Sequence, residues 1–299
     1  MSLYEAVKNA LLAGRNNAHA TLVDRFAYPL TGSGLIYERM AERIKAQGGE
    51  VRLRTPVKAV RTKERRVSGV ELESGEVLPF DQVISSMPLT LLVQQLDDAT
   101  PEAKSAARSL RFRSTILVYL HVDGTELFPD NWVYIHDSSM GAGRVTNFRN
   151  WVPQLYGDKK TSILALEYWC YDNEPLYTTS DDELIRLATQ EIKASGLVGT
   201  PNVLGGHVVR IRRCYPVYSR GYKALLDPIV ECVKSISGLS AIGRYGAFKY
   251  NNQDHSILMG LWAAENLSRG TKHDLWSVNT DYEYQEGARI TDTGLEPLS

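Results

Sequence analysis

The sequence predicts an α/β protein that is α+β when taken as a whole. Residues 34–88 show the pattern of a helix followed by strands, whereas residues 111–166 show strands joined by irregular polar connections. Strands connected in that second way form antiparallel sheets rather than further βαβ units. The length agrees with this prediction, because 299 residues are enough for two hydrophobic cores.

Composition and charge are those of an ordinary globular chain. Hydrophobic residues make up 43% and charged residues 23%, and the net charge is −1. No basic field therefore indicates a nucleic acid or an anionic membrane partner, and no stretch approaches the roughly 20 apolar residues that span a bilayer. The three cysteines lie far apart, without the spacing of a zinc site or a disulfide framework. We expect a cytoplasmic protein with no nucleic-acid partner, no membrane span and no metal.

The first predicted helix follows a glycine-rich turn at residues 28–34. It carries Ile36, Met40 and Ile44 on one face and ends at residues 48–49, which are both glycine. The strands expected after it are a short one at 51–53, a β meander at 57–72 and a buried strand at 81–86 that Pro88 ends.

The middle of the chain predicts the antiparallel sheet and one covering helix. The helix opens at Ser180, with Glu183 at capping-box spacing, and ends at Gly196. The strand candidates are residues 116–120, 132–135, 163–166 and 208–213.

The last unit places a polar loop, residues 244–253, between a short strand at 239–243 and a helix that starts near Asp254. Ligands of open α/β sheets bind outside the carboxyl ends of the strands, and a helix N-terminus attracts anions there. The Arg244 guanidinium has a fork geometry that suits phosphate. The alternative is that Asp254 caps the helix and Arg244 is a solvated charge. The helix is expected to bury Ile257, Leu261 and Ala264.

This unit resembles a known flavin-binding segment. Gly243-Arg244 and the run from Tyr250 to Ile257 are similar to the C-terminal FAD segment of the FAD-dependent amine oxidase and protoporphyrinogen oxidase superfamily. The likeness is greatest to the subgroup related to UDP-galactopyranose mutase. Residues 28–34, 55–57, 81–88 and 215–218 fit the same pattern, and the resemblance spans roughly residues 3–286.

The resemblance implies an incomplete FAD/NAD(P)-binding Rossmann-like domain with an inserted antiparallel-sheet substrate domain. The implied divisions are an N-terminal helical segment 1–27, FAD-binding parts 28–105 and 226–268, a substrate domain 106–225 and a tail 269–299.

The resemblance also implies which residues hold the FAD cofactor. The helix start faces the flavin pyrimidine edge and stabilises negative charge on the reduced ring, while Arg244 lies near the diphosphate or the flavin edge. The Val57 backbone contacts the adenine. The implied FAD residues are Val57, Gly243, Arg244, Tyr250, Asn252, Gln253, Asp254, His255 and Ser256.

A small-molecule substrate is expected between the flavin and the antiparallel sheet. Arginine and aromatic side chains suit a nucleotide sugar or another anion through bidentate contacts and stacking, although such residues are also common on exposed strands without a ligand. The candidates are Arg144, Asn147, Arg149, Trp151, Arg213, Tyr215 and Tyr218. No catalytic residue is assigned. His255 suits an acid or base, and we favour a polar contact.

One departure from the family pattern changes what is expected of the chain. Proteins of this class carry a G-x-G-x-x-G segment that cradles the FAD pyrophosphate, and residues 32–34 and 141–143 do not complete one. The chain is then the C-terminal part of a longer flavoprotein, a chain completed by a partner, or a binding module that has lost FAD. An active form either rearranges a nucleotide sugar as the mutases do or oxidises a small molecule.

Overall fold

The structure is a computed structural model that describes residues 28–278, 288–291 and 294–297. The predicted N-terminal helical segment 1–27 lies outside the described residues. Residues 29–279 form one compact unit. A second unit includes the hairpin of β11 (Ala288–Thr291) and β12 (Gly294–Pro297).

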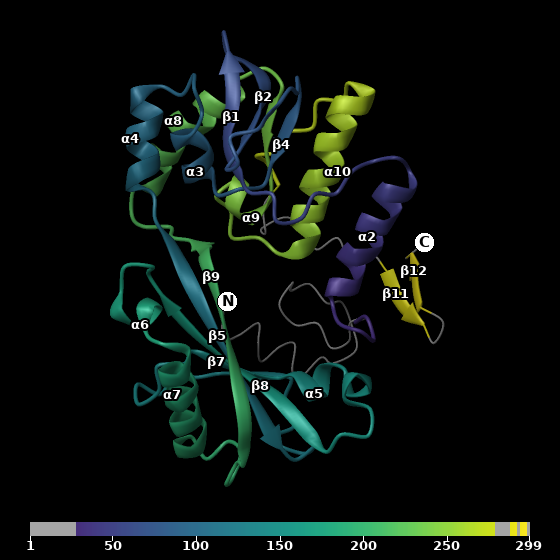
Figure 1. Ribbon diagram of the computed structural model, residues 1–299, viewed down its shortest axis with the longest axis vertical. Coiled ribbons are helices and arrows are strands. Elements are labelled where there is room, and N and C mark those ends of the chain that lie inside the picture. Colours follow the sequence, from purple (N-terminus) through teal and green to yellow (C-terminus); the bar gives the residue numbers. More distant parts are fainter. Residues whose placement is uncertain (1–27, 279–287, 292–293, 298–299) are drawn as a thin grey trace, which may run out of the picture. The chain divides into compact units, whose positions relative to one another are not determined.

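The predicted antiparallel sheet is present and has five strands (Figure 1). In spatial order these are β6 (Trp132–Tyr134), β7 (Arg144–Asn147), β8 (Thr161–Cys170), β5 (Phe112–Asp123) and β9 (Val203–Pro216). The strand β7 was not among the predicted ones. The short helices beside the sheet are α5 (Phe148–Trp151), η1 (Pro153–Tyr156) and α6 (Pro175–Thr178).

The side chains of strand β5 alternate between the two faces of this sheet. Ile116, Val118 and Leu120 are buried and pack with residues of α7 (Asp181–Ala194) in one core, whereas Leu117 and Tyr119 point to the opposite face and are half-buried. The capping box of Ser180 and Glu183 that starts α7 is confirmed. The face without α7 is the one that remains open to a ligand.

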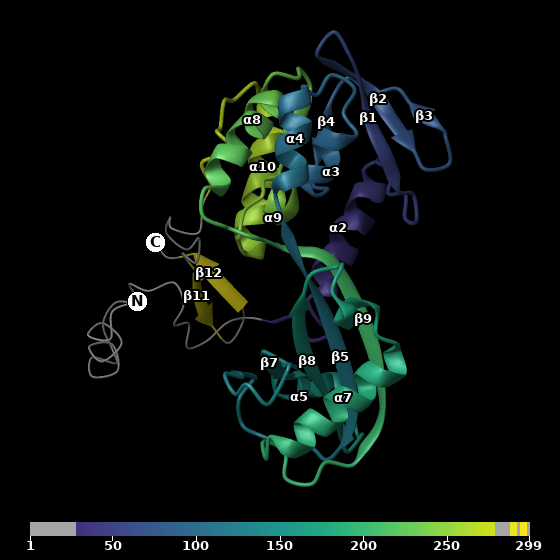
Figure 2. The ribbon, with the colours of Figure 1, turned by 90° about the vertical axis from the view of Figure 1, so that its left-hand side faces the viewer.

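The second core belongs to the α/β part of the chain. It is enclosed by α3 (Leu89–Gln94), α4 (Pro101–Ser109) and α8 (Tyr222–Lys234). The predicted meander is confirmed as β1 (Val57–Lys63), β2 (Arg66–Leu72) and β3 (Val77–Leu78), all antiparallel (Figure 2). Strands β4 (Val83–Ser85) and β10 (Leu239–Ala241) form a separate parallel pair.

Two helices complete the α/β part. Helix α2 (Gly34–Ala46) is confirmed and ends where Gly48 adopts a φ of 85°, yet none of its residues is buried. Helix α10 (Gln253–Arg269) is confirmed, but its buried residues are His255, Met259 and Ala263.

Four expectations are wrong in detail. Residues 51–53 form no strand, and Leu53 is 80% exposed, because a strand needs a neighbour for its backbone groups and no described strand pairs with them. Strand β4 is shorter than 81–86 and only partly buried, with Ile84 39% exposed. The loop 244–253 begins with the short helix α9 (Gly243–Gly246). Ile257, Leu261 and Ala264 of α10 are exposed, because the apolar cluster of Ala247 and Trp276 packs on the neighbouring face.

No helix in the described part of the chain is both long enough and apolar enough to cross a membrane.

Candidate flavin and substrate sites

The carboxyl ends of β4 and β10 meet at one edge. The Ile242 N–H donates a 2.9 Å hydrogen bond to the Ser85 carbonyl, and α9 starts at once with Gly243, whose φ of 77° favours glycine. A Cβ atom at Gly246 would lie 2.9 Å from the Ser85 oxygen. Glycine at this position therefore lets α9 lie directly on the end of β4, and the chain passes across the edge where ligands of such sheets bind.

The start of α10 lies beside this edge. A Cβ atom built on Gly243 would be 4.0 Å from the Ser256 Oγ atom, so the two ends of the motif lie close together. Asn252 occupies the N-cap position without a side-chain capping bond. First-turn N–H groups have no partner within their own helix, and their dipole end attracts negative charge. Asp254 sits in this turn, and its Oδ1 atom contacts the His255 Nδ1 atom at 2.8 Å.

One buried polar atom at this edge has no hydrogen-bond partner among the described residues. This atom is the second carboxylate oxygen of Asp254. A buried acceptor without a donor is unfavourable, and a hydroxyl or ring N–H of a flavin would supply the donor. The unpartnered carboxylate oxygen and the start of α10 at this edge are compatible with the ring end of a flavin. The sequence offers no G-x-G-x-x-G cradle for the pyrophosphate end.

Arg244 joins this edge to the antiparallel sheet. Its Nε atom donates a 3.0 Å hydrogen bond to the Asn251 carbonyl. Its guanidinium carbon lies 4.7 Å from the Tyr250 ring centroid and 5.1 Å from that of Tyr215 in β9. The two rings stack with centroids 5.6 Å apart. We call these three residues, Arg244, Tyr215 and Tyr250, the Arg244 cluster; it places two predicted flavin residues against one predicted substrate residue.

Tyr218 supports the cluster from the side. Its hydroxyl accepts a 2.7 Å hydrogen bond from the Tyr250 N–H and donates to the Phe248 carbonyl at 3.3 Å. Burial raises the pKa of both Tyr215 and Tyr218, so each phenol keeps its proton and remains a donor.

The other predicted substrate residues make contacts within the protein. Arg144 forms a bidentate pair with Glu167, with N–O distances of 2.7 and 2.8 Å. Asn147 is buried and donates to the Phe128 carbonyl. The Trp151 indole N–H donates to the Asn131 carbonyl.

Two predicted residues lie away from the Arg244 cluster. Arg213, with a φ of 56°, lines a separate cavity of about 370 Å³ together with Arg111 and Tyr171. Val57 starts β1 and is 39% exposed, and no contact joins it to the motif at residues 243–257 among those that the structure describes.

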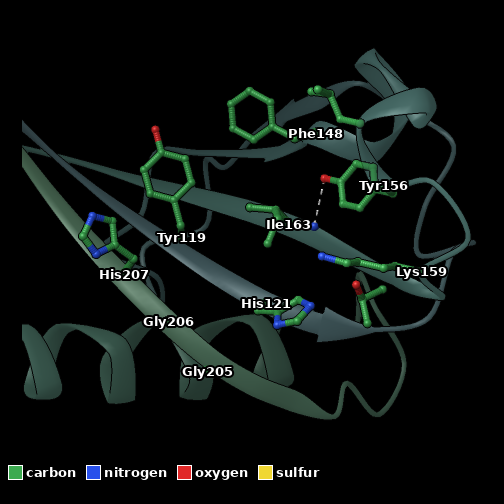
Figure 3. A pocket seen from close by; sticks show the side chains of 11 residues that line it. Tyr119, His121, Phe148, Tyr156, Lys159, Ile163, Gly205, Gly206 and His207 are labelled. Carbon is green, nitrogen blue, oxygen red and sulfur yellow. Dashed lines mark hydrogen bonds between the residues drawn. The ribbon is translucent and has the colours of Figure 1, made fainter. Parts of the chain in front are cut away.

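Sequence reasoning missed a pocket on the open face of the sheet. Its volume is about 690 Å³ (Figure 3). The side chains that carry its chemistry are Tyr119, His121, Phe148, Tyr156, Lys159 and His207. They come from β5, α5, η1, the turn before β8 and β9. The signal available in the sequence was the alternation of Tyr119 and His121 with buried β5 residues.

Two walls of this pocket are fixed by internal contacts. Tyr119 and Phe148 stack with ring centroids 6.0 Å apart. The Tyr156 hydroxyl accepts a 3.2 Å hydrogen bond from the Ile163 N–H, drawn as a dashed line in Figure 3. The Arg149 guanidinium lies 4.8 Å over the Tyr156 ring and donates to the Thr161 carbonyl. Arg149, a predicted substrate residue, thus supports a pocket wall.

Comparison with known proteins identifies the family. Residues 5–225 match the family described as flavin-containing amine oxidoreductase, which is well over half of the chain. The chain belongs to this family. Membership implies a flavin cofactor and confirms the resemblance to the FAD-dependent amine oxidase superfamily. The matched residues end before the motif at 243–257, so the roles of that motif remain proposals.

Curated relatives include coproporphyrinogen III oxidases. The protein of Mycobacterium bovis is 30% identical over 171 residues, which cover 52% of this chain and 36% of the relative, and that of Mycobacterium tuberculosis matches equally. The chain therefore spans about a third of the length of the curated relatives that it matches.

Solved structures share the fold. Reduced UDP-galactopyranose mutase has a TM-score of 0.71 at 22% identity, covering 81% of this chain and 52% of the mutase. A putrescine oxidase redesigned in its cofactor binding has a TM-score of 0.58 at 16% identity, covering 80% of this chain and 53% of the oxidase. These likenesses confirm the fold class, a flavin-oxidoreductase α/β fold with an antiparallel sheet.

Proposed function

We propose that this chain forms the substrate domain and part of the FAD site of an oxidoreductase that acts on a porphyrinogen-like small molecule. The observation that carries the proposal is the Arg244 cluster. It joins the edge where β4, β10 and α10 meet to the open face of the antiparallel sheet. A ring bound at that edge would face a substrate lying on the sheet.

The proposed FAD contacts follow from the geometry of this edge. The start of α10 stabilises negative charge on the ring, and the orphaned Asp254 oxygen accepts a hydrogen bond from the cofactor. Bound flavin supplies the electron-accepting chemistry, and the protein supplies binding, orientation and electrostatics. We keep the divisions 28–105 and 226–268 for the FAD-binding parts and 106–225 for the substrate domain.

The substrate class rests on the curated relatives and on the sheet. Those relatives are named as oxidases of coproporphyrinogen III, and they are the more similar in sequence. Beside the flavin edge, Tyr215 of the sheet stacks on Tyr250, and such rings suit a large ring system because aromatic side chains favour stacked contacts.

A nucleotide sugar is the second candidate. The arrangement that favours it is the cation of Arg244 beside two stacked tyrosines, which suits a phosphate next to a base. The likeness to UDP-galactopyranose mutase supports the fold and not this substrate.

The test supplies the purified chain with FAD, with dioxygen as the acceptor that reoxidises the reduced flavin, and with one substrate at a time. We expect porphyrin fluorescence to appear from coproporphyrinogen III faster than in controls with free FAD alone. Arg244→Ala should reduce the rate at least about tenfold, the equivalent of about 1.4 kcal/mol. Arg212→Ala is the matched control, because Arg212 lies in the same strand as Tyr215 but is exposed and paired with Asp172.

Two results decide against the proposal. A rate no greater than that of free FAD contradicts porphyrinogen oxidation by this chain. Binding of UDP-galactopyranose to the FAD-loaded chain, with no turnover of the porphyrinogen, supports the second candidate instead.

A further inference from the structure

The pocket on the open sheet face is lined by aromatic, lysine and histidine side chains that take no part in the flavin edge. It lies at the end of the sheet where β5 finishes and β9 begins, because His121 pairs with Gly205 and Ile163 in the strand register. Tyr215 of the Arg244 cluster pairs with Arg113, near the other end of β5. The pocket and the cluster thus occupy opposite ends of one sheet face.

The pocket is lined by flat aromatic surfaces that are held in place before any ligand binds. Tyr119 stacks on Phe148, and Tyr156 is fixed by Arg149 and by the Ile163 N–H. Fixed walls reduce the entropy lost when a ligand binds. Rings with this arrangement favour a planar, conjugated partner through stacked or edge contacts.

The polar groups of the pocket carry positive or neutral charge. Lys159, His121 and His207 line it, and none of the described lining residues is acidic. No hydrogen bond or ion pair holds the Lys159 ammonium within the described part of the chain. Lys159 lies two residues before Thr161, which pairs with Asp123, so the lysine reaches the same end of the pocket as His121 (Figure 3).

Gly205 leaves space at that end. A Cβ atom built on it would meet nothing within 4 Å, and its φ lies outside the left-handed region. A side chain at Gly205 would therefore be tolerated by the backbone and would fill the pocket, since paired residues in a strand register share a face.

We propose that this pocket binds a planar aromatic ligand through an anionic carboxylate, with the ring between Tyr119 and Tyr156 and the carboxylate at Lys159. The inference does not depend on the proposed function: it concerns residues outside the flavin edge and requires no cofactor.

The test measures binding of coproporphyrin III, a planar tetracarboxylate, to the full chain by the change in porphyrin absorbance. We expect saturable binding. Lys159→Met should weaken it at least about tenfold, because the variant removes a charge-assisted hydrogen bond to the carboxylate. Lys160→Met changes the net charge equally at an exposed neighbour and should alter the dissociation constant less than twofold.

Gly205→Trp should abolish binding, and Gly205→Ala should leave it intact. Thermal melting of each variant checks that the chain is folded. The proposal is overturned if a folded Gly205→Trp variant binds as the wild type does, or if Lys159→Met and Lys160→Met weaken binding equally. UDP that competes for the site with the same dependence on Lys159 would overturn the assignment to a carboxylated ring.

A parallel titration with FAD separates this inference from the proposed function. A chain that takes up FAD but no porphyrin contradicts the pocket assignment alone. A chain that binds porphyrin in the pocket but takes up no FAD contradicts the proposed function alone.

Discussion

Glu71 shows how single charged residues hold the α/β part together. Its side chain is largely buried in β2, receives a 2.7 Å hydrogen bond from Lys58 and pairs with Arg61. These hydrogen bonds, that of Lys58 first, lower the pKa of the Glu71 carboxyl. A carboxylate with a pKa lower in the folded than in the unfolded state stabilises the fold above the unfolded pKa. That contribution is lost as the pH falls through the folded value.

Because the pKa of Glu71 is lower in the folded state, the stability of the fold should depend on pH. The free energy of unfolding should decrease as the pH falls from about 5 to below about 4, the range in which an ordinary glutamate titrates. Glu71→Gln should make the curve flatter in that range, whereas Glu73→Gln, an exposed neighbour, should leave the slope unchanged. Urea denaturation at several pH values measures this. Equal slopes for wild type and Glu71→Gln would contradict the assigned role.

Among single residues, the motif at residues 243–257 is predictable from sequence, but the contact that Tyr215 makes with it is not. Gly243, Arg244 and Tyr250 lie within a few residues of each other, so local sequence carries the pattern. Tyr215 reaches them only because β9 ends beside the loop. The pocket residues come from separate segments, and single-sequence patterns do not show which distant segments share a cavity.

Glycines decide how the elements at the flavin edge approach each other. A Cβ atom at Gly246 would lie 2.9 Å from the Ser85 oxygen, whereas one at Gly260 in α10 would lie 3.9 Å from the nearest atom, Ile242 Cδ1. The two positions are a matched pair, because both lie in helices that contact the same edge.

We predict opposite effects of alanine at these two glycines. Gly246→Ala should destabilise the fold by about 1–3 kcal/mol, the range for overpacking. Gly260→Ala should be neutral or stabilising by up to about 1 kcal/mol, because alanine is the better helix former. Chemical denaturation measures both. A stable Gly246→Ala variant would show that α9 does not rest on β4.

At the scale of elements, periodicity predicted what local sequence controls. The capping box of α7, the glycine end of α2 and the meander of β1 and β2 were all found. The strand at 51–53 was wrong because a strand depends on a neighbour. The prediction of which face of α10 is buried was wrong, because both candidate faces are apolar and tertiary packing against Trp276 selects one.

On the scale of the whole molecule, two separate cores lie in the α/β part and in the sheet part. The α/β part retains exposed apolar residues, such as Met40 in α2 and Ile84 in β4, at 44% and 39% exposure. The sequence predicted both the class of fold and the inserted sheet. It could not predict the open sheet face, because that face is formed by register between strands whose paired residues lie up to 104 positions apart, as Phe112 and Pro216 do.

FAD uptake by the purified chain is the decisive measurement of whether residues 243–257 form part of a FAD site. We expect a flavin absorbance spectrum that is perturbed on binding and remains with the protein through gel filtration. Asp254→Ala should weaken retention at least about tenfold, the equivalent of about 1.4 kcal/mol, while Glu265→Ala at the other end of α10 should not. A chain that stays colourless after incubation with excess FAD would contradict the claim.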